Sequence, residues 1–209
     1  MIVGALGAEF RRFEERVYEG QNARAVIAEC VYPTDIADLW DAVTNEERIP
    51  RWFSPVTGDL KLGGRYKIKG NAEGVITRCD PPRAFDLTWE FGGGTSWVNV
   101  RLAQEAEGTR FTLEHIAPIG IMAEHWDSYG PAAVGAGWDL ALVGLRTYLA
   151  SGESIDHEQF EQWSTTAEGM AFVRASTAAW AQAHIAAGAD PEIAQGMAER
   201  TAKFYTGEA

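Results

Sequence analysis

The sequence predicts an α+β fold in which a curved antiparallel sheet wraps around one long helix. Between residues 56 and 116, short runs of alternating apolar and polar residues are separated by Gly and Pro, which is typical of antiparallel strands with one buried face. Residues 132–152 then carry apolar side chains at three- and four-residue spacing, which predicts a long amphipathic helix. Both elements bury their apolar faces when the sheet curls around the helix, and the core between them can be hollow.

Composition and charge restrict the function. The 209 residues include 30 acidic and 18 basic side chains, a formal net charge of −12, so we expect no nucleic-acid partner. No run of about eighteen apolar residues is present, so we expect no membrane span. The N-terminus lacks the features of a signal peptide, and Cys30 and Cys79 have no C-x-x-C spacing. We therefore predict a cytoplasmic protein with reduced thiols.

The N-terminal region predicts a strand. Residues 10–18 and 23–32 flank the sequence EGQN, whose composition is typical of a turn. Residues 23–32 alternate in hydrophobicity and end at Pro33, which predicts a strand.

Two short helices are expected next. Residues 34–43 have apolar side chains at helical spacing, and Thr34 or Asp35 can cap them. The sequence TNEE that follows matches a capping box, so we expect a second short helix from Thr44 that stops near Trp52.

The sheet is expected to contain about six further strands with one buried face. The clearest runs are GGRYKIKG, EGVITRCD, AFDLTWEF, SWVNVRLA and TRFTLEHI. In AFDLTWEF, alternation assigns Phe85, Leu87, Trp89 and Phe91 to the buried face. In TRFTLEHI, it assigns Phe111, Leu113 and His115 to the buried face. Residues 92–94, all glycine, predict a hairpin and not a phosphate-binding loop, because no helix with G-K-[ST] follows them.

An irregular connection is expected over residues 117–131. We interpret it as a mobile lid over the mouth of a cavity, with Trp126 as its apolar contact. Glu124, His125 and Asp127 lie close together there, but their spacing matches no zinc motif, so we predict neither a metal nor a cofactor.

The chain divides into a main domain, residues 1–153, and a helical extension, residues 154–209, that packs on the domain or on a second subunit. Within the long helix the apolar stripe is Val134, Trp138, Ala141, Leu142, Leu145 and Leu149, and glycines at 135, 137 and 144 allow another backbone to come close. The extension predicts three helical pieces, the last beginning with the cap Asp190 and Pro191. The expected inward face of that last helix is Ile193, Met197, Ala198, Thr201, Phe204 and Tyr205.

Several motifs resemble a known family. The segment VYPTDIADLWDAVTNEERIPRWFSP…GDLKLGGRY resembles the opening signature of heat-shock-protein-90 ATPase activator-like proteins of the SRPBCC (START/Bet v 1-like) superfamily. GVITRCDPPRAFDLTW, GTRFTLEH and GWDLALVGLRTYL are similar to the later strands and the long helix of that family. The resemblance covers about residues 10–152, and the extension resembles those of some actinobacterial members, which implies a bacterial protein.

The resemblance implies the helix-grip fold with a cavity between sheet and long helix. We therefore predict a binding protein for a small hydrophobic or aromatic molecule, either a monomer or a homodimer. The expected ligand-binding residues are Phe53, Tyr66, Phe85, Leu87, Trp89, Phe111, Leu113, His115, Trp126, Trp138, Leu142 and Leu145. His115 is the expected polar anchor, although it can equally be a core histidine bonded to a backbone carbonyl. Of the neighbouring aromatics, Phe53 is expected to face the cavity, and Trp52 to pack between the short helices and the sheet.

Two alternatives remain open. The family implies a chaperone as an alternative partner, which makes a protein-interaction module the second hypothesis. The third is an enzyme similar to polyketide aromatase/cyclases, with His115 as the proton carrier. Ser54, Ser96 and Ser128 lack a G-x-S-x-G context, and no pair of carboxylates is expected on the inner face, so we assign no catalytic residue.

Overall fold

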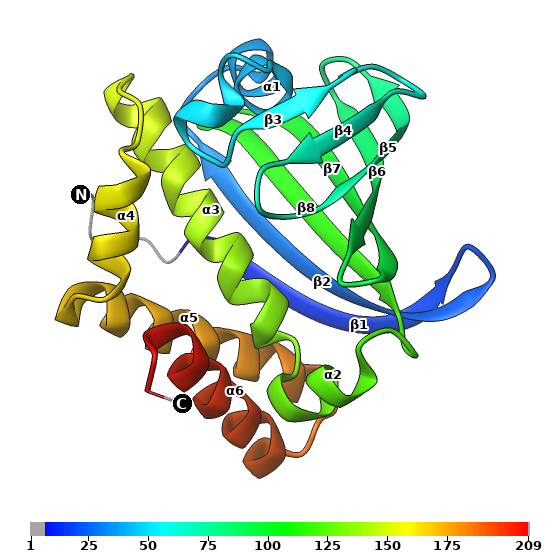
Figure 1. Cartoon of the computed structure of the whole chain (residues 1–209), viewed down its shortest axis with the longest axis vertical. Helices are drawn as coiled ribbons and strands as arrows, with labels where there is room; N and C mark the ends of the chain where they lie inside the picture. Colours follow the sequence, from blue (N-terminus) through cyan, green and yellow to red (C-terminus); the bar gives the residue numbers. More distant parts are fainter. Residues whose placement is uncertain (1–6, 209) are drawn as a thin grey trace.

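A computed structural model describes residues 7–208, apart from the side chains at 157, 161 and 164. Its centre is one antiparallel sheet in the order β1-β2-β8-β7-β6-β5-β4-β3. The strands are β1 (Phe10–Tyr18), β2 (Gln21–Tyr32), β3 (Val56–Gly58), β4 (Arg65–Ile68), β5 (Glu73–Asp80), β6 (Ala84–Phe91), β7 (Gly94–Glu105) and β8 (Gly108–Pro118). The sheet curves around a single long helix, so the predicted α+β helix-grip architecture is confirmed (Figure 1).

The helices cover the concave face and one end of this sheet (Figure 1). They are α1 (Ile36–Thr44), the 3-10 turn η1 (Ile49–Arg51), α2 (Ala123–Tyr129), α3 (Ala132–Ser151), α4 (His157–Ser164), α5 (Ala167–Ala186) and α6 (Pro191–Thr206). The residues that begin α1 and α6, and the glycine that ends α3, are typical helix-capping residues. Asp35 accepts a hydrogen bond from the backbone of Asp38, Gly152 ends α3 with φ +71°, and Asp190 caps α6.

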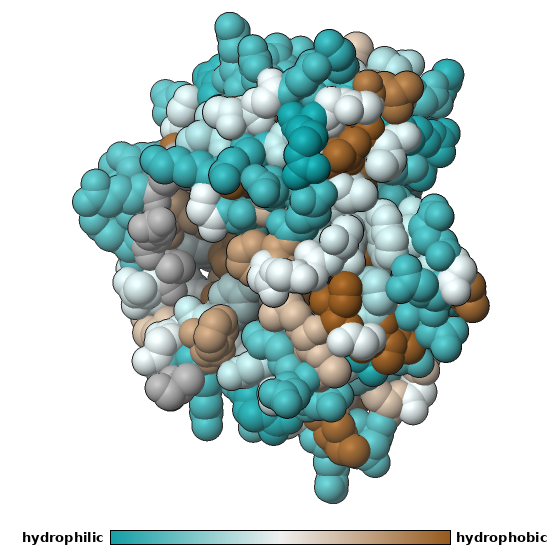
Figure 2. All heavy atoms as spheres, turned by 45° about the vertical axis from the view of Figure 1, so that its right-hand side comes forward, coloured by the Kyte–Doolittle hydropathy of each residue, from teal (hydrophilic) through white to brown (hydrophobic). Residues whose placement is uncertain are grey.

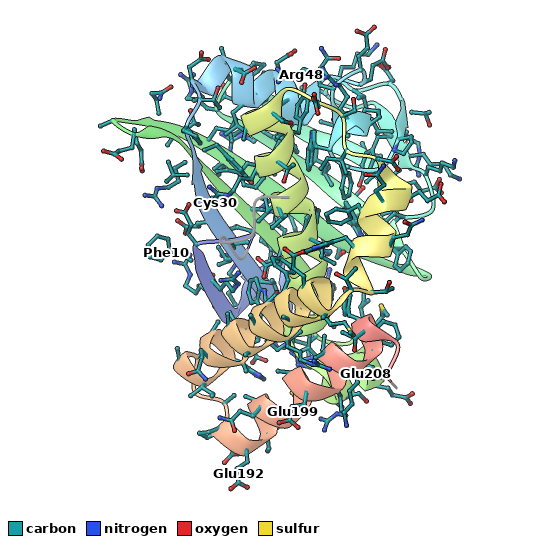
Figure 3. All side chains as sticks on the ribbon, turned by 90° about the vertical axis from the view of Figure 1, so that its left-hand side faces the viewer. Phe10, Cys30, Arg48, Glu192, Glu199 and Glu208 are labelled. Carbon is teal, nitrogen blue, oxygen red and sulfur yellow. The ribbon has the colours of Figure 1, made fainter. Side chains whose placement is uncertain are left out.

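The expectation that residues 10–18 only flank a turn was incomplete. They form the edge strand β1, which pairs with β2 along its whole length. The turn is confined to Glu19 and Gly20, both with positive φ, which suits a two-residue hairpin. Phe10 points away from the sheet at this edge and is 62% exposed (Figure 3).

Two other local predictions were wrong. Thr44 does not cap a second helix, because it is the last residue of α1 and its hydroxyl donates to the carbonyl of Trp40. Asn45 accepts from the backbone of Glu47 instead, and only the 3-10 turn η1 follows. The connection over 117–131 is also not wholly irregular, since part of it forms α2.

The long helix α3 is held to the sheet and to α1 by close backbone and side-chain contacts. Tyr32 on β2 is fully buried and donates its hydroxyl hydrogen to the carbonyl of Leu142. Arg48 reaches the far end of α3 and donates to the hydroxyl of Tyr148 (Figure 3). A Cβ at Gly144 would lie 2.6 Å from the carbonyl oxygen of Trp52, so the expected close backbone approach exists here.

The extension packs against α3 and β1 (Figure 1). The indole of Trp180 on α5 lies directly on Gly135, where a Cβ would come within 2.1 Å of the ring. The predicted inward face of α6 was partly wrong, since Ile193 and Phe204 are 57% and 56% exposed. The buried face consists of the small side chains Ala194, Ala198, Thr201 and Ala202, which allow α6 to lie close to α5.

A buried carboxylate joins these layers. Asp139 on α3 is fully buried, and its Oδ1 accepts from the backbone N–H of Ala8 at 2.8 Å. Its Oδ2 accepts from Arg11 on β1 and, on α5, from the hydroxyl of Ser176 at 2.5 Å and the indole N–H of Trp180 at 3.0 Å. One side chain thus connects α3, β1 and the extension.

We expect Asp139→Asn to be strongly destabilising. The amide removes the charge that compensates the buried Arg11 and cannot accept all of these hydrogen bonds, so the free energy of unfolding should fall by about 3–5 kcal/mol. Urea denaturation followed by circular dichroism measures this. The matched control is Asp127→Asn on the exposed side of α2, which should change the free energy by less than about 0.5 kcal/mol. Equal effects of the two substitutions would contradict the role of Asp139.

Candidate functional site

An inner cavity of about 270 Å³ lies between the sheet and α3. Its sheet wall comes from alternate residues of neighbouring strands, including Phe85, Leu87 and Trp89 on β6, Val98 and Val100 on β7, and Phe111 and Leu113 on β8. Its helix wall comes from Trp138, Ala141 and Leu142, and α1 and the segment after it close one side with Trp40, Val43, Ile49, Trp52 and Phe53. The walls of this partly open cavity are therefore formed mainly by apolar and aromatic groups.

Both hydroxyls at this cavity, and one of its indole N–H groups, are hydrogen-bonded to backbone carbonyls. The hydroxyl of Tyr66 donates to the carbonyl of Thr88 at 2.7 Å, and the hydroxyl of Thr44 donates to that of Trp40. The indole N–H of Trp52 donates to the carbonyl of Ala42 at 2.8 Å. The inner cavity thus presents mainly apolar surface and few hydrogen-bonding groups.

A second, outer cavity of about 330 Å³ adjoins the first. Its walls come from β2, β6 to β8, α2, α3 and the last helix, α6. The polar residues among them are Arg24, Asn71, Ser96, His115, His125 and Tyr205. Seen from one side, the molecular surface is mostly hydrophilic, with separate apolar patches in the right-hand half of the view (Figure 2).

Three aromatic side chains separate the two cavities, because Phe53, Trp89 and Trp138 line both of them. Phe53 lies parallel to Trp138 with a centroid distance of 6.4 Å, and Trp89 meets Trp138 at 5.3 Å with a tilt of 59°. Trp89 and Trp138 are fixed in a strand and a helix, whereas Phe53 belongs to the irregular segment after η1. Phe53 is consequently the member of this partition whose position depends least on regular structure.

His115 lies beside this partition and is bonded through both ring nitrogens. Its Nδ1 accepts from the indole N–H of Trp138 at 3.1 Å, which places the proton of the neutral ring on Nε2. Nε2 then donates to the hydroxyl of Ser96 at 2.9 Å, and Ser96 donates to the carbonyl of Trp89 at 3.2 Å. This chain of hydrogen bonds connects α3 to β6, β7 and β8.

The ring of His115 is neutral at physiological pH. Burial lowers its pKa from 6.5 to about 4, because the charged form loses hydration at this half-buried position in the cavity wall. A protonated Nδ1 could not accept from Trp138, so geometry and pKa agree on the neutral tautomer. With both nitrogens engaged, His115 orients Trp138 and Ser96 in this structure.

The structure brings most of the expected binding residues together. Those on the inner cavity are Phe53, Tyr66, Phe85, Leu87, Trp89, Phe111, Leu113, Trp138 and Leu142. His115 and Trp126 line the outer cavity instead, and Leu145 is fully buried in the packed core beyond both. Trp52 lines the inner cavity together with Phe53.

Some residues of the site were not identified from the sequence. The inner cavity also includes Val56, Leu60, Ile68, Ile76, Cys79 and Pro81. Alternation along β4 and β5 could have indicated the positions of Ile68 and Ile76. Arg24 and Tyr205 reach the outer cavity from β2 and α6, and no spacing in the sequence relates these two positions to each other.

The curved sheet, the long helix and the cavity between them define the class as a ligand-binding fold of the SRPBCC type. The family described as "Activator of Hsp90 ATPase homolog 1-like protein" matches residues 33–150, more than half of the chain. This protein therefore belongs to that family, within the SRPBCC superfamily. The segments before residue 33 and after residue 150 lie outside the match.

Solved structures agree with this assignment. The crystal structure of CalU16 from Micromonospora echinospora is 32% identical, with a TM-score of 0.59 over 78% of this chain and 94% of that chain. The solution structure of CalU16 covers 95% of this chain and 93% of that chain at 28% identity, with a TM-score of 0.63. DynU16, a protein of the dynemicin biosynthetic locus, shares the fold at 22% identity and a TM-score of 0.56, over 62% of this chain and 48% of that chain.

No curated relative matches the sequence. Within residues 7–208, no helix is long and apolar enough to cross a membrane.

We expect His115 to make folding sensitive to acid. Because its pKa is lowered in the fold, the unfolded chain binds the proton more tightly between pH 6.5 and 4, and stability is lost as the pH falls through that window. Between pH 7 and pH 5 this amounts to about 2 kcal/mol of unfolding free energy. Urea denaturation of the wild type and of His115→Gln at both pH values isolates the effect from that of the carboxylates. An equal loss of stability in both proteins would contradict a His115 that is neutral in the folded state.

Proposed function

We propose that this protein binds a small apolar, aromatic molecule in the inner cavity. The observation that carries the proposal is a partly open space of about 270 Å³ whose walls are aromatic and aliphatic and whose hydroxyl groups already have partners. Burial of apolar surface contributes roughly 25 cal/mol per Å², so a ligand that fills such a space gains most of its affinity from shape and area. Phe85, Leu87 and Trp89 would contact it from the sheet, and Trp138 and Leu142 from α3.

Several of the expected binding residues would have roles other than lining the ligand directly. Phe53, Trp89 and Trp138 would form the inner boundary that a ligand passes or displaces. His115 would act through Trp138 and Ser96, whose positions it fixes by hydrogen bonds, rather than as the direct anchor of a ligand. Trp126 belongs to the wall of the outer cavity.

The similarity to DynU16 is consistent with a small-molecule role, because that protein belongs to a biosynthetic locus. An interaction with a chaperone ATPase is the rival proposal that the family description suggests. Adding the protein to a heat-shock protein 90 homologue from the same cell separates the two. Stimulated ATP hydrolysis that persists when the inner cavity is blocked would favour the chaperone role over ligand binding.

The test of binding uses N-phenyl-1-naphthylamine, an uncharged aromatic whose fluorescence rises in apolar surroundings. We expect saturable binding by the wild type and at least a tenfold weaker affinity for Leu142→Trp, because the indole occupies the cavity. Leu62→Trp is the control, since it makes the same change at a side chain that is 60% exposed. Circular dichroism establishes that both variants are folded, and Ala141→Phe is a second way to fill the space. If the wild type does not bind, or if cavity-filling variants bind as well as the control, the proposal fails.

The rate at which Cys79 is modified provides an independent measurement of ligand binding in the inner cavity. Its thiol lines the inner cavity and is partly exposed, whereas burial raises the pKa of Cys30 to about 12 and keeps that thiol protonated. We expect N-ethylmaleimide to modify Cys79 first and saturating N-phenyl-1-naphthylamine to slow this reaction severalfold. Mass spectrometry of the modified protein measures the rate. Cys79→Ser should remove the fast reaction, and an unchanged rate with ligand present would place the ligand elsewhere.

A further inference from the structure

We propose that the outer cavity is a second binding compartment, completed by the C-terminal extension, that receives the anionic group of an aromatic acid whose ring system fills the inner cavity. This inference rests on the proposed function and adds the chemical class of the ligand. It also assigns a role to the helices beyond residue 150, which lie outside the family match.

The extension supplies part of the cavity wall through α6. The hydroxyl of Tyr205 donates to the carbonyl of Ala133 at 2.9 Å, in the first turn of α3. The same hydroxyl lies 3.1 Å from the position of a Cβ at Gly137, so the glycine makes room for it. Tyr205 is therefore seated against α3 at the cavity and is not merely close to it.

The last helix also positions α2, which forms another wall of the outer cavity. Arg200 donates to the carbonyl of Ser128 at 2.7 Å, and the hydroxyl of Thr201 donates to that of Tyr129 at 2.9 Å. These bonds fix the end of α2, the helix that carries His125 and Trp126. Removing the extension would thus remove one wall of the compartment and the support of another.

The charge at this cavity differs from that of the whole chain. Among the described residues that line it there is neither Asp nor Glu, although acidic residues outnumber basic ones by 30 to 18 overall. Arg24 is the formally charged member, and its guanidinium lies 4.6 Å from the ring centre of Trp126. Its Nε donates to Glu15 at the exposed side. A guanidinium at a cavity wall favours a carboxylate or sulfonate through charge-assisted hydrogen bonds.

The two compartments suit two parts of one molecule. Among the described residues, no charged side chain lines the inner cavity and its hydroxyl groups already have partners, so a charged substituent buried there would stay unpaired at high cost. The outer cavity begins on the other side of Phe53, Trp89 and Trp138. A turn of the Phe53 ring would connect the two spaces, because Phe53 alone of the three lies outside helix and strand. A ligand with its aromatic rings in the inner cavity and its acid group beside Arg24 then suits both cavities.

The test compares two fluorescent probes that differ by one anionic group. N-phenyl-1-naphthylamine is uncharged, and 1-anilinonaphthalene-8-sulfonate is the same skeleton with a sulfonate. We expect the sulfonate to bind the wild type about tenfold more tightly than the uncharged probe, and Arg24→Met to remove this difference. Arg12→Met is the matched control, because Arg12 on β1 is mostly exposed and should leave both affinities unchanged. Leu142→Trp should abolish binding of both probes.

The role of the extension is tested with the same probes. Tyr205→Ala opens the wall at α6 and should weaken the sulfonate severalfold, with a smaller effect on the uncharged probe. Ile193→Ala is its control, since Ile193 lies on the same helix, is 57% exposed and lines neither cavity, and it should change neither affinity. Denaturation curves establish that both variants keep their fold.

The outcomes separate the two proposals. Binding of the uncharged probe decides the proposed function, and its absence overturns both. If the uncharged probe binds but the sulfonate has no advantage, or if Arg24→Met weakens both probes equally, the anionic compartment is overturned and the inner site stands. If Arg24→Met acts as expected but Tyr205→Ala matches Ile193→Ala, the contribution of the extension is overturned.

Discussion

The carboxylate of Asp139 is the interaction on which the arrangement of the layers depends. It is buried in the middle of α3, and its hydrogen-bond donors come from the segment before β1, from β1 itself and from α5. A buried charge of this kind is tolerated only when donors surround it, so each donor segment is held in one position. Because α5 is fixed there, Trp180 packs on Gly135 and α6 lies where Tyr205 and Arg200 reach α3 and α2. The walls of the outer cavity therefore depend on the hydrogen bonds of Asp139.

The space between sheet and helix stays open because large rings line it. Phe53, Trp89 and Trp138 contact one another and divide the interior without filling it. His115 holds Trp138 from the sheet side, and it does so only as a neutral ring. The described part of the interior thus has one compartment lined by uncharged, mainly apolar side chains and one with a guanidinium at its wall, two properties that a single uniform core would not combine.

Much of the inner wall could be predicted because strands have a side-chain period of two. Once Phe85, Leu87 and Trp89 were assigned to the buried face of a strand, their positions at the cavity followed. Phe91 was assigned to the same face, and this was wrong, because it ends the strand beside the hairpin and is 51% exposed. Leu145 shows the limit of this reasoning. It continues the apolar stripe of α3, but it lies almost one turn beyond Leu142, where the core is fully packed. Periodicity gives the face of an element, whereas the end of a cavity depends on which partners pack there. The prediction that Thr44 caps a second helix was wrong for a related reason, because a capping-box pattern also fits the end of a preceding helix.

The sequence by itself determined the order and type of most of the elements, the cap at Asp190, a cap at Thr34 or Asp35, and most of the apolar faces of the sheet and α3. These depend on neighbours a few residues apart, which local patterns record. Only the tertiary structure decided that Asp139 is a junction, that the interior is divided in two, and that Arg24 and Tyr205 share the outer cavity. Such features join residues far apart in the chain, and their energies depend on distances and burial that no local pattern contains.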